Sequence, residues 1–424
     1  MVFSISTAGL IVSFPTFFML RRLKNIGPGA MVAAAFIGPG TVTTATIAGA
    51  SYGFTLLWAI VFSVVATYLL QEMSSRLGVV GQMGVGEAIR KKVTTPTLRW
   101  ISTLLVIGAI VIGNAAYEAG NITGAVLGFD SFTEDFAGLR FNPLIFIIGL
   151  AAFALLFSGK YKIIERSLVI MVSVMGVVFL FSAIMLAPNL ADVLKGIFVT
   201  TLPKGALLMV VGLIGTTVVP YNLFLHASAV KERWSGKDDL SDSRWDTIIS
   251  VIIGGLITMS ILISSAVAFA GKNKIVRGGA DLAEQLYPVL GDWSVFFIAF
   301  GFLAAGLSSS ITAPLAAAFA TSEILGWKHD LKGKSFRMVW LFVLLCGILF
   351  SSLGFSPTSV ILFAQISNGM LLPVVALFLL WIVNDREILG DHVNSKLTNI
   401  AGGIVIFLTL VLGLRGILSA LNLL

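Results

Sequence analysis

The sequence predicts an all-α protein that crosses a membrane about eleven times, and three observations lead to this fold class. Of its 424 residues, 57% are hydrophobic and 12% are charged, whereas soluble domains carry about 25% charged residues. The mean hydropathy is +0.99. Apolar runs long enough to span a bilayer, about 20 residues each, alternate with short charged segments. The lipid bilayer is therefore the expected partner of most outward-facing side chains.

The expected spans are separated by segments that concentrate the charge. Examples are "RKKVTTPTLR" (90–99) and "KERWSGKDDLSDSRW" (231–245). Residues 1–24 precede the first span and are expected to form a cytoplasmic or peripheral segment. The spans are expected at 27–52, 53–75, 101–127, 142–158, 163–187, 205–230, 247–270, 293–324, 337–354, 357–382 and 398–421.

The basic residues predict how the chain is oriented. If the N-terminus is cytoplasmic, the inner segments carry 21 of the 28 lysines and arginines, and the outer segments carry 6. Basic residues favour the cytoplasmic side. We therefore expect a bacterial inner membrane protein with its N-terminus in the cytoplasm and its C-terminus outside. The same bias accounts for the net charge of +7 without a nucleic-acid partner.

Reactive and metal-binding motifs are sparse. The single cysteine, Cys346, lies in an apolar run and has no second cysteine for an internal disulfide. The three histidines are not spaced as a zinc site. The sequence contains neither a phosphate-binding loop nor a nucleophile elbow. We therefore expect no enzymatic activity and no cofactor.

Two of the expected spans are interrupted near their middles. The first contains "FIGPGTVTTA" (36–45), in which Pro39 lies between two glycines, and the sixth contains "GTTVVPYN" (215–222). Glycine and proline weaken a helix, and proline also lacks a backbone N–H. Unpaired backbone groups at membrane depth are tolerated only where they face protein or a water-filled cavity. A simple kink is the alternative at each position.

The two interruptions occupy corresponding places in two groups of five spans. These groups are 25–190 and 205–382, and a further span, 398–424, follows them. Paired interruptions of this kind point to inverted repeats with a substrate site between the unwound helices. The pattern predicts a secondary transporter that works by alternating access. A membrane protein that binds a solute or senses it without transport is the alternative from another class.

Three stretches resemble one known family, and the resemblance extends over nearly the whole chain after residue 24. They are "IGPGAMVAAAFIGPGTVTTATIAGASYGFTLLWAIVFSVVATYLLQ" (26–71), "VVPYNLFLHAS" (218–228) and "GLSSSITAPLAAAF" (306–319). With these motifs the sequence resembles the NRAMP family of proton-coupled divalent metal transporters. The resemblance implies a leucine-transporter-type fold, which is a 5+5 inverted repeat with helices 1 and 6 broken. It also implies transport of a divalent metal cation.

The positions of the family's metal ligands hold other residues in this sequence. The family's first break reads Asp-Pro-Gly-Asn, and both polar residues bind the metal, whereas this chain has Gly38 and Thr41. The methionine ligand of the sixth helix is replaced by Val219. Soft ligands favour transition metals, so these changes argue against selective manganese or iron transport and leave no strong metal-ligand set. The other positions of the sixth-helix motif hold Thr216, Pro220, Tyr221 and Asn222.

Two kinds of substrate remain compatible with the interrupted helices. Backbone carbonyls, threonine hydroxyls and Gln365 can hold a partly hydrated divalent cation through oxygen. The backbone N–H groups of Gly40 and Thr41, at the start of a half-helix, instead favour the carboxylate of a small organic solute such as an amino acid. The candidate substrate-binding residues are Gly38, Gly40, Thr41, Thr216, Thr217, Val219, Tyr221, Asn222 and Gln365.

The third span carries the one acid that lies deep within an expected span. In "GNAAYEAGNITGA" (113–125), Asn114, Glu118 and Asn121 share a helix face at positions i, i+4 and i+7. Ionisable residues inside a membrane are functional candidates, so we expect Glu118 to handle protons or cations. A packing hydrogen bond is the alternative. The resemblance aligns Glu118 and Asn121 with two acids on the family's proton route, and the loss of one acid argues against proton coupling of that kind.

His226 is the remaining candidate for coupling. It follows Asn222 by one helical turn and shares its face. Histidine changes its protonation near neutral pH, which suits a proton relay. A neutral histidine bonded to a carbonyl is the alternative.

Overall fold

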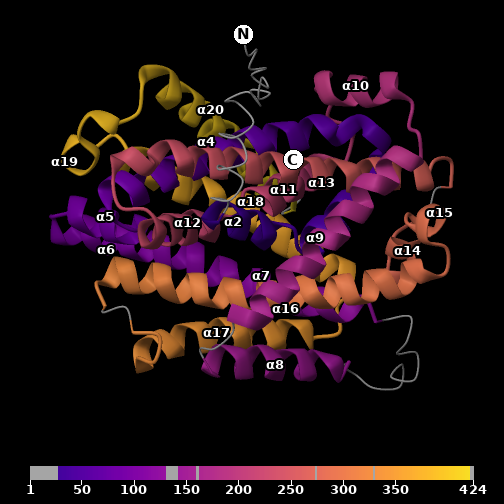
Figure 1. The fold of residues 1–424 in the computed structure, drawn as a ribbon, viewed down its shortest axis with the longest axis horizontal. Coiled ribbons are helices and arrows are strands. Elements are labelled where there is room, and N and C mark those ends of the chain that lie inside the picture. Colours follow the sequence, from indigo (N-terminus) through magenta and orange to yellow (C-terminus); the bar gives the residue numbers. More distant parts are fainter. Residues whose placement is uncertain (1–26, 130–141, 159–161, 273–274, 328–329, 421–424) are drawn as a thin grey trace, which may run out of the picture.

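The computed structural model describes residues 27–129, 142–158, 162–272, 275–327 and 330–420. Within these ranges every regular element is a helix, and the longest helices run beside one another along the long axis of the molecule (Figure 1). The predicted all-α class is confirmed. The helices of the first half are α2 (Pro28–Phe36), α3 (Pro39–Tyr52), α4 (Leu57–Gly81), α5 (Val85–Lys92), α6 (Pro96–Ile107), α7 (Gly113–Leu127), α8 (Leu144–Ser158), α9 (Lys162–Met185) and α10 (Leu190–Phe198).

The second half continues the same pattern. Its helices are α11 (Leu207–Thr217), α12 (Pro220–Arg233), α13 (Leu240–Ala268), α14 (Gly279–Glu284), α15 (Tyr287–Leu290), α16 (Trp293–Leu325), α17 (Lys334–Ser351), α18 (Pro357–Ile382), α19 (Arg386–Leu389) and α20 (Lys396–Ala420). Short helical turns are η1 (Gly53–Leu56), η2 (Gly108–Ile112), η5 (Lys237–Asp239) and η6 (Gly390–His392). The division of the chain into two five-span repeats stays a prediction.

The number of spans differs from the expected eleven. In the described part of the chain, eight helical stretches are long and apolar enough to cross a membrane, or nine if α9 and α10 form one bent span. Two features explain the difference. The stretch Pro39–Gly81 runs through η1 without a gap, so two expected spans count as one. Helix α8 has 15 residues, fewer than the about 20 that span a bilayer.

Proline begins several of the helices. Pro39, Pro96, Pro220 and Pro357 each stand in the first turn of a helix. The missing N–H has no intrahelical acceptor there, and the fixed φ of proline suits a helix. In both interrupted spans a proline therefore starts the second half-helix.

Helix α7 lies inside the bundle. It contacts α16, α17 and α18, and α8 and α17 lie side by side as an outer layer (Figure 1). Glycines permit the close packing: Gly347 of α17 leaves room for the Glu118 side chain, and Gly306 of α16 lies against Ala125. Small residues pack membrane helices in this way. A π-helical turn, η2, joins α6 to α7.

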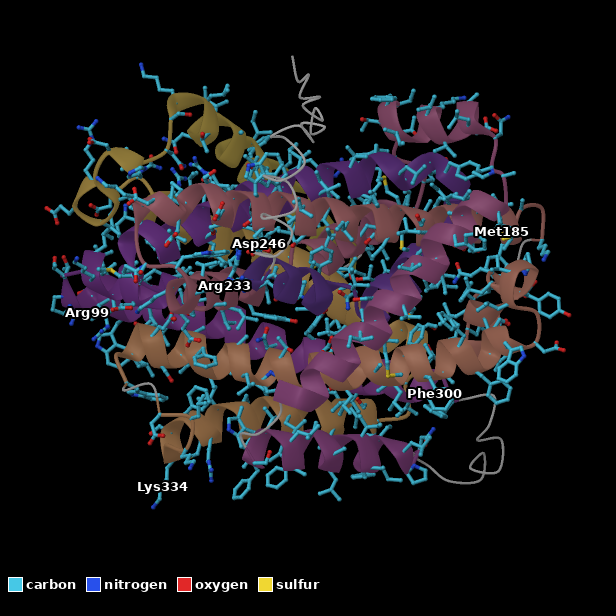
Figure 2. All side chains as sticks on the ribbon, viewed as in Figure 1. Arg99, Met185, Arg233, Asp246, Phe300 and Lys334 are labelled. Carbon is cyan, nitrogen blue, oxygen red and sulfur yellow. The ribbon has the colours of Figure 1, made fainter. Side chains whose placement is uncertain are left out.

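Large apolar side chains are exposed on the outward faces of the helices. They include Met185 and Phe300 (Figure 2) and Phe342, with exposed fractions of 55%, 52% and 52%. Large apolar side chains exposed in this number are unusual on a soluble monomer. A bilayer covers such side chains, which agrees with an integral membrane protein.

The bundle has two chemically different ends, which we name after the short helices there. At the α5 end, the C-terminal parts of α4, α12 and α16 lie near α5, the N-terminal part of α13 and the segment before α20. The α14 end joins the C-terminal part of α13 to the N-terminal part of α16, and Figure 1 shows α5 and α14 far apart. Arg76, Lys92 and Arg244 lie at the α5 end. This is the side predicted to be cytoplasmic, and the orientation itself stays a prediction.

Candidate functional site

The first interruption separates α2 from α3 over Ile37 and Gly38. Gly38 is extended (φ −115°, ψ −175°), and no side chain caps α3. The hydroxyl of Thr41 donates to the carbonyl of Phe36, which ties the last turn of α2 to the first turn of α3. The helix is broken at the predicted position.

The second interruption separates α11 from α12 over Val218 and Val219. Val219 is extended (φ −80°, ψ 120°), no side chain caps α12, and Pro220 follows. The local design is the same as at the first interruption, where an extended residue without a capping side chain precedes a proline. The predicted break of the sixth span is confirmed.

The two interruptions meet through threonine hydroxyls and one glutamine. The Oγ1 atoms of Thr41 and Thr216 are hydrogen-bonded at 2.7 Å. Gln365 of α18 lies against both segments. A Cβ added to Gly40 would overlap its side-chain amide, and a Cβ added to Gly215 would overlap its backbone carbonyl. The structure thus brings together residues from three separate sequence motifs.

Several buried polar atoms in this region have no hydrogen-bond partner among the described residues. They are both amide atoms of Asn222, the amide oxygen of Gln365 and the amide nitrogen of Asn368. All three side chains are at most 1% exposed. A buried polar group without a partner costs about 1–3 kcal/mol, and an ordered water or a ligand can satisfy it. The region therefore has hydrogen-bonding capacity for a small polar solute or a hydrated ion.

The predicted polar stripe of the third span faces the interior. Glu118 is fully buried, and its Oε2 atom accepts a hydrogen bond from the Asn121 amide at 3.1 Å. Its side chain also lies near the hydroxyl of Ser310 of α16. Asn114 donates to a backbone carbonyl of α16 at 2.8 Å. Beside Glu118, Tyr117 packs edge-on against Tyr221 with ring centroids 5.6 Å apart, so this helix reaches the second interruption.

His226 of α12 is paired with a residue of α4. Its Nδ1 atom lies 2.8 Å from the amide oxygen of Gln71. An amide oxygen only accepts hydrogen bonds, so Nδ1 donates and Nε2 is the free acceptor. That Nε2 atom is buried without a partner among the described side chains. A proton-relay role for His226 stays a prediction.

Some of the nominated residues have less free capacity than their types suggest. The hydroxyl of Thr41 already contacts Phe36 and Thr216. The hydroxyl of Thr217 donates within α11, to a carbonyl one turn earlier, and Val219 lies in the apolar core. Within the described ranges, no three His, Cys, Asp or Glu side chains gather where they could hold a metal ion.

Three further acids are buried at the α5 end, and none of them lies deep in an expected span. Glu72, Asp246 and Glu323 are 9%, 3% and 4% exposed. Asp246, labelled in Figure 2, accepts hydrogen bonds from the backbone N–H groups of Gly27 (2.9 Å) and Gly29 (2.6 Å). A carboxylate is favourable at a helix N-terminus, so Asp246 holds the start of α2 against α13.

Glu323 performs the same task for α5. It accepts hydrogen bonds from the N–H of Gly86 (3.0 Å) and the hydroxyl of Ser228 (2.5 Å), and so joins α16 to α5 and α12. A Cβ on Gly84 or Gly86 would overlap the Glu323 side chain. The sequence feature that could indicate these two acid contacts is the Gly-x-Gly pattern at 27–29 and 84–86. Glycines leave the backbone N–H groups accessible to a carboxyl group from another helix.

The other end of α5 is held by Lys92. Its ammonium lies 3.2 Å from a carboxylate oxygen of Asp385 and 4.4 Å from the ring centre of Trp381. Partial burial alone would raise the pKa of Asp385. The backbone N–H of Glu387 and the Lys92 ammonium outweigh burial and hold that pKa below its usual value.

The fold and the site together define a class of protein. An all-helical membrane bundle in which two broken helices meet at a buried polar site is the architecture of a secondary transporter. Comparison with known proteins then gives the family. The family model described as natural resistance-associated macrophage protein-like matches residues 29–419, and the chain belongs to this Nramp family.

Relatives and solved structures agree with this assignment. A divalent metal cation transporter, MntH of Klebsiella pneumoniae (strain 342), is 26% identical over 408 residues and 93% of each chain is covered. The crystal structure of the Eremococcus coleocola manganese transporter with an aromatic bis-isothiourea substituted compound has a TM-score of 0.72 and 22% identity, covering 98% of this chain and 89% of that chain. Mhp1, a nucleobase-cation-symport-1 family transporter in a closed conformation with bromovinylhydantoin bound, has a TM-score of 0.56 and 14% identity, with 93% of each chain covered. These structures share the fold, which confirms the predicted leucine-transporter type.

Proposed function

We propose that this protein is a secondary transporter that works by alternating access around its two interruptions and carries a divalent cation held by neutral oxygen atoms. The observation that carries the proposal is the junction of the interruptions, where Thr41 and Thr216 are hydrogen-bonded and Gln365 lies against both segments. The substrate class is supported by the relatives, since the Klebsiella pneumoniae protein is a divalent metal cation transporter and the Eremococcus coleocola protein a manganese transporter.

The residues at the junction favour a hard, hydrated ion. Gly38 supplies no carboxylate and Val219 no sulfur. Oxygen donors and retained water suit magnesium and calcium, whereas a soft ligand would favour transition metals. Removing the hydration of a charge costs several kcal/mol unless opposite charge replaces it, so the ion is expected to keep part of its water. Manganese and iron selectivity are expected to be lost.

Coupling is assigned to the buried acid of α7 and to the histidine of α12. Glu118 is fully buried, and one ring nitrogen of His226 has no partner among the described residues. Asn121 donates a hydrogen bond to Glu118 and has no proton of its own to exchange. Proton coupling is therefore expected to be weaker than with a pair of acids. The predicted setting is a bacterial inner membrane with a cytoplasmic N-terminus, on the strength of the basic loops.

A small organic solute, such as an amino acid, is the second candidate. The amide of Asn222, the amide oxygen of Gln365 and the amide nitrogen of Asn368, which have no partner among the described residues, favour it, because amides bind neutral or anionic groups as well as cations. The N–H groups at the start of α3, on Gly40 and Thr41, suit a carboxylate.

The first test is calorimetric titration of the purified protein with magnesium and with manganese, paired with uptake into proteoliposomes. We expect weak binding of magnesium and accumulation of the ion, without preference for manganese. Micromolar manganese binding by the unaltered protein would refute the ligand argument. Binding of neither ion, with uptake of an amino acid, would favour the second candidate, and accumulation of no solute would favour a sensor.

The second test restores the missing ligands. A triple variant carrying Gly38→Asp, Thr41→Asn and Val219→Met is expected to gain manganese binding and uptake. The matched control exchanges Gly38→Asn in place of Gly38→Asp and so adds the same bulk without charge. A Cβ at position 38 would lie 3.3 Å from the Ser309 hydroxyl, so both variants require the same small adjustment. Equal manganese binding by the two variants would contradict the proposed role of the charge.

A further inference from the structure

A cavity of about 450 Å³ lies at the α5 end, beside the outer faces of α4 and α13. It is separate from the interruptions, because Thr67 of α4 contacts the carbonyl of Thr217 while the next residue, Tyr68, lines the cavity. The full lining is Tyr68, Lys237, Asp238, Leu240, Ser241, Arg244, Trp245 and Ile248.

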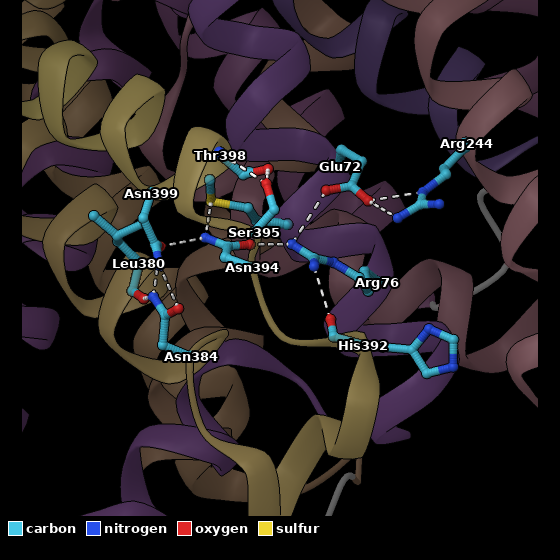
Figure 3. A network of polar contacts seen from close by, with 11 residues as sticks. Glu72, Arg76, Arg244, Leu380, Asn384, His392, Asn394, Ser395, Thr398 and Asn399 are labelled. Atoms are coloured by element: carbon cyan, nitrogen blue, oxygen red, sulfur yellow. Dashed lines mark hydrogen bonds and ion pairs between the residues drawn. The ribbon is translucent and has the colours of Figure 1, made fainter.

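The polar side of this cavity holds two basic residues, Lys237 and Arg244, and one acid, Asp238. Arg244 binds one oxygen of Glu72 through Nε and Nη2, both at 2.8 Å. Arg76 binds the other oxygen of Glu72 at 3.3 Å, and Figure 3 shows the two arginines on opposite sides of that carboxylate. Two guanidinium groups therefore share one carboxylate. The exposed Lys237 adds a further positive charge, which Asp238 offsets in part.

The other side of the cavity opens onto an apolar stripe. Trp245, Ile252 and Leu256 lie on one face of α13 and are 44%, 46% and 45% exposed. On α4, Val65 precedes the cavity residue Tyr68 by about one turn and is 52% exposed. Tryptophan and tyrosine are enriched where a membrane protein meets the lipid headgroups. The cavity thus lies where a polar headgroup meets the apolar face of the bundle.

We propose that this cavity binds the phosphate of a membrane phospholipid, with its acyl chains along the stripe formed by Trp245, Ile252 and Leu256. In this proposal Lys237 and Arg244 pair with the phosphate, and the hydroxyls of Ser241 and Tyr68, which also line the cavity, donate to it. Basic pockets between membrane helices recognise headgroups in this way. Asp238 weakens the attraction for a free anion, so the apolar stripe is what selects a lipid over inorganic phosphate.

A ligand in this cavity is expected to affect residues that do not line it. Arg244 is linked through Glu72 to Arg76, which donates to the carbonyl of His392 at 2.7 Å and to the amide oxygen of Asn394 (Figure 3). A phosphate on Arg244 therefore stabilises a network that connects α4 and α13 to the segment before α20.

The test measures binding of phosphatidylglycerol to the full-length protein in detergent, by native mass spectrometry and by the shift in melting temperature. Lys237→Gln is expected to weaken this binding about fivefold, from the roughly 1 kcal/mol that one basic residue contributes near a membrane surface. Lys334→Gln, an exposed lysine outside the cavity, is the matched control and is expected to change nothing. Lys237→Arg keeps the charge and is expected to retain binding.

Two further ligands separate the possible sources of the effect. Inorganic phosphate carries the headgroup chemistry without chains, and diacylglycerol carries the chains without phosphate. We expect neither to reproduce the stabilisation by phosphatidylglycerol. An equal shift with inorganic phosphate would identify a free-anion site, and an equal shift with diacylglycerol would identify unspecific solvation by lipid. Either result, or equal binding by the Lys237→Gln and Lys334→Gln variants, would overturn the proposal.

Discussion

At the α5 end, buried acids join the helices to one another, whereas at the α14 end neutral side chains and close backbone contacts do so. Asp246 and Glu323 each bind the N-terminal part of another helix. At the α14 end, Gln285 donates to the Thr46 hydroxyl at 2.8 Å, and Gly279 packs against a backbone carbonyl of α7. The same bundle is therefore closed by two different kinds of contact.

The difference suggests which end separates more readily. When a carboxylate leaves a backbone N–H, water can hydrogen-bond to both groups, so the net cost of each bond is modest. When packed apolar surface and backbone separate, the hydrophobic free energy is lost in proportion to area. We expect the α5 end to open first. Substitutions at the two ends, described below from the largest expected effect to the smallest, test this difference.

The largest effect is expected from Arg76→Ala. Arg76 is 4% exposed and binds Glu72, the carbonyl of His392 and Asn394. Its removal leaves the carbonyl of His392 and the amide oxygen of Asn394 without their buried charged donor and leaves Glu72 with Arg244 alone, so a loss of about 3 kcal/mol in the free energy of unfolding is expected. Denaturant titration in mixed micelles measures it. A loss below about 1 kcal/mol would show that this network stabilises the protein no more than an exposed ion pair does.

The second effect is expected from Glu323→Ala. The N–H of Gly86 and the hydroxyl of Ser228 lose their carboxyl acceptor, which costs about 2 kcal/mol. Hydrogen exchange across 84–92 is expected to accelerate, while exchange in α14 stays unchanged. Equal acceleration at both ends would show general destabilisation instead of a local release of α5.

A smaller effect is expected from Asp246→Ala. The start of α2 loses its acceptor for Gly27 and Gly29, and loss of a helix cap costs about 1 kcal/mol. Faster hydrogen exchange confined to 27–36 is the expected signature. Asp246→Asn keeps one acceptor oxygen and serves as the control with an intermediate effect.

The smallest effect is expected at the α14 end, from Lys272→Ala. The Lys272–Glu284 pair is 2.9 Å long, but its side chains are 51% and 32% exposed. Exposed pairs contribute about 0–1 kcal/mol and are screened by salt. If this substitution destabilised the protein as much as Arg76→Ala, the contrast between the two ends would fail.

Local features of the site are predictable from the sequence. The interruptions follow from proline and glycine at 38–40 and from Pro220, whose effect on a helix needs no distant partner. The shared face of Asn114, Glu118 and Asn121 follows from helical periodicity. Both kinds of inference depend on residues within a few turns of one another, and the structure agrees with both.

Partners across the bundle are not predictable in this way. The Thr41–Thr216 bond joins residues 175 positions apart, and the His226–Gln71 bond joins residues 155 apart. Nothing near these residues in the chain specifies the pairing. The sequence therefore predicts which types of side chain lie in the site. It does not predict which of these side chains are hydrogen-bonded to one another.

Asp246 is missed because the predicted start of its helix is wrong. The expected seventh span begins at 247, which leaves Asp246 outside it, beside a charged loop. The structure begins α13 at Leu240, so Asp246 is helical and faces the start of α2. The first turns of α13 are polar, so their local hydropathy is low. A span predicted from hydropathy therefore begins later than the helix itself and misses the acid that binds another helix.

The π-helical turn at Gly108–Ile112 has a consequence for how this site can change. Such a turn holds one residue more than an α-helical turn. Deletion of one residue there would convert the π-turn into an α-helical turn, and because the wide turn already absorbs the extra residue, α7 would keep nearly the same rotation relative to α6. Glu118 would stay in its place opposite Gly347. The same deletion in the regular helix between this turn and Glu118 would rotate the residues beyond it by about 100° and carry the carboxyl away from that place. The turn is therefore a position in this span where the chain can lose one residue while the buried carboxyl stays in the interior.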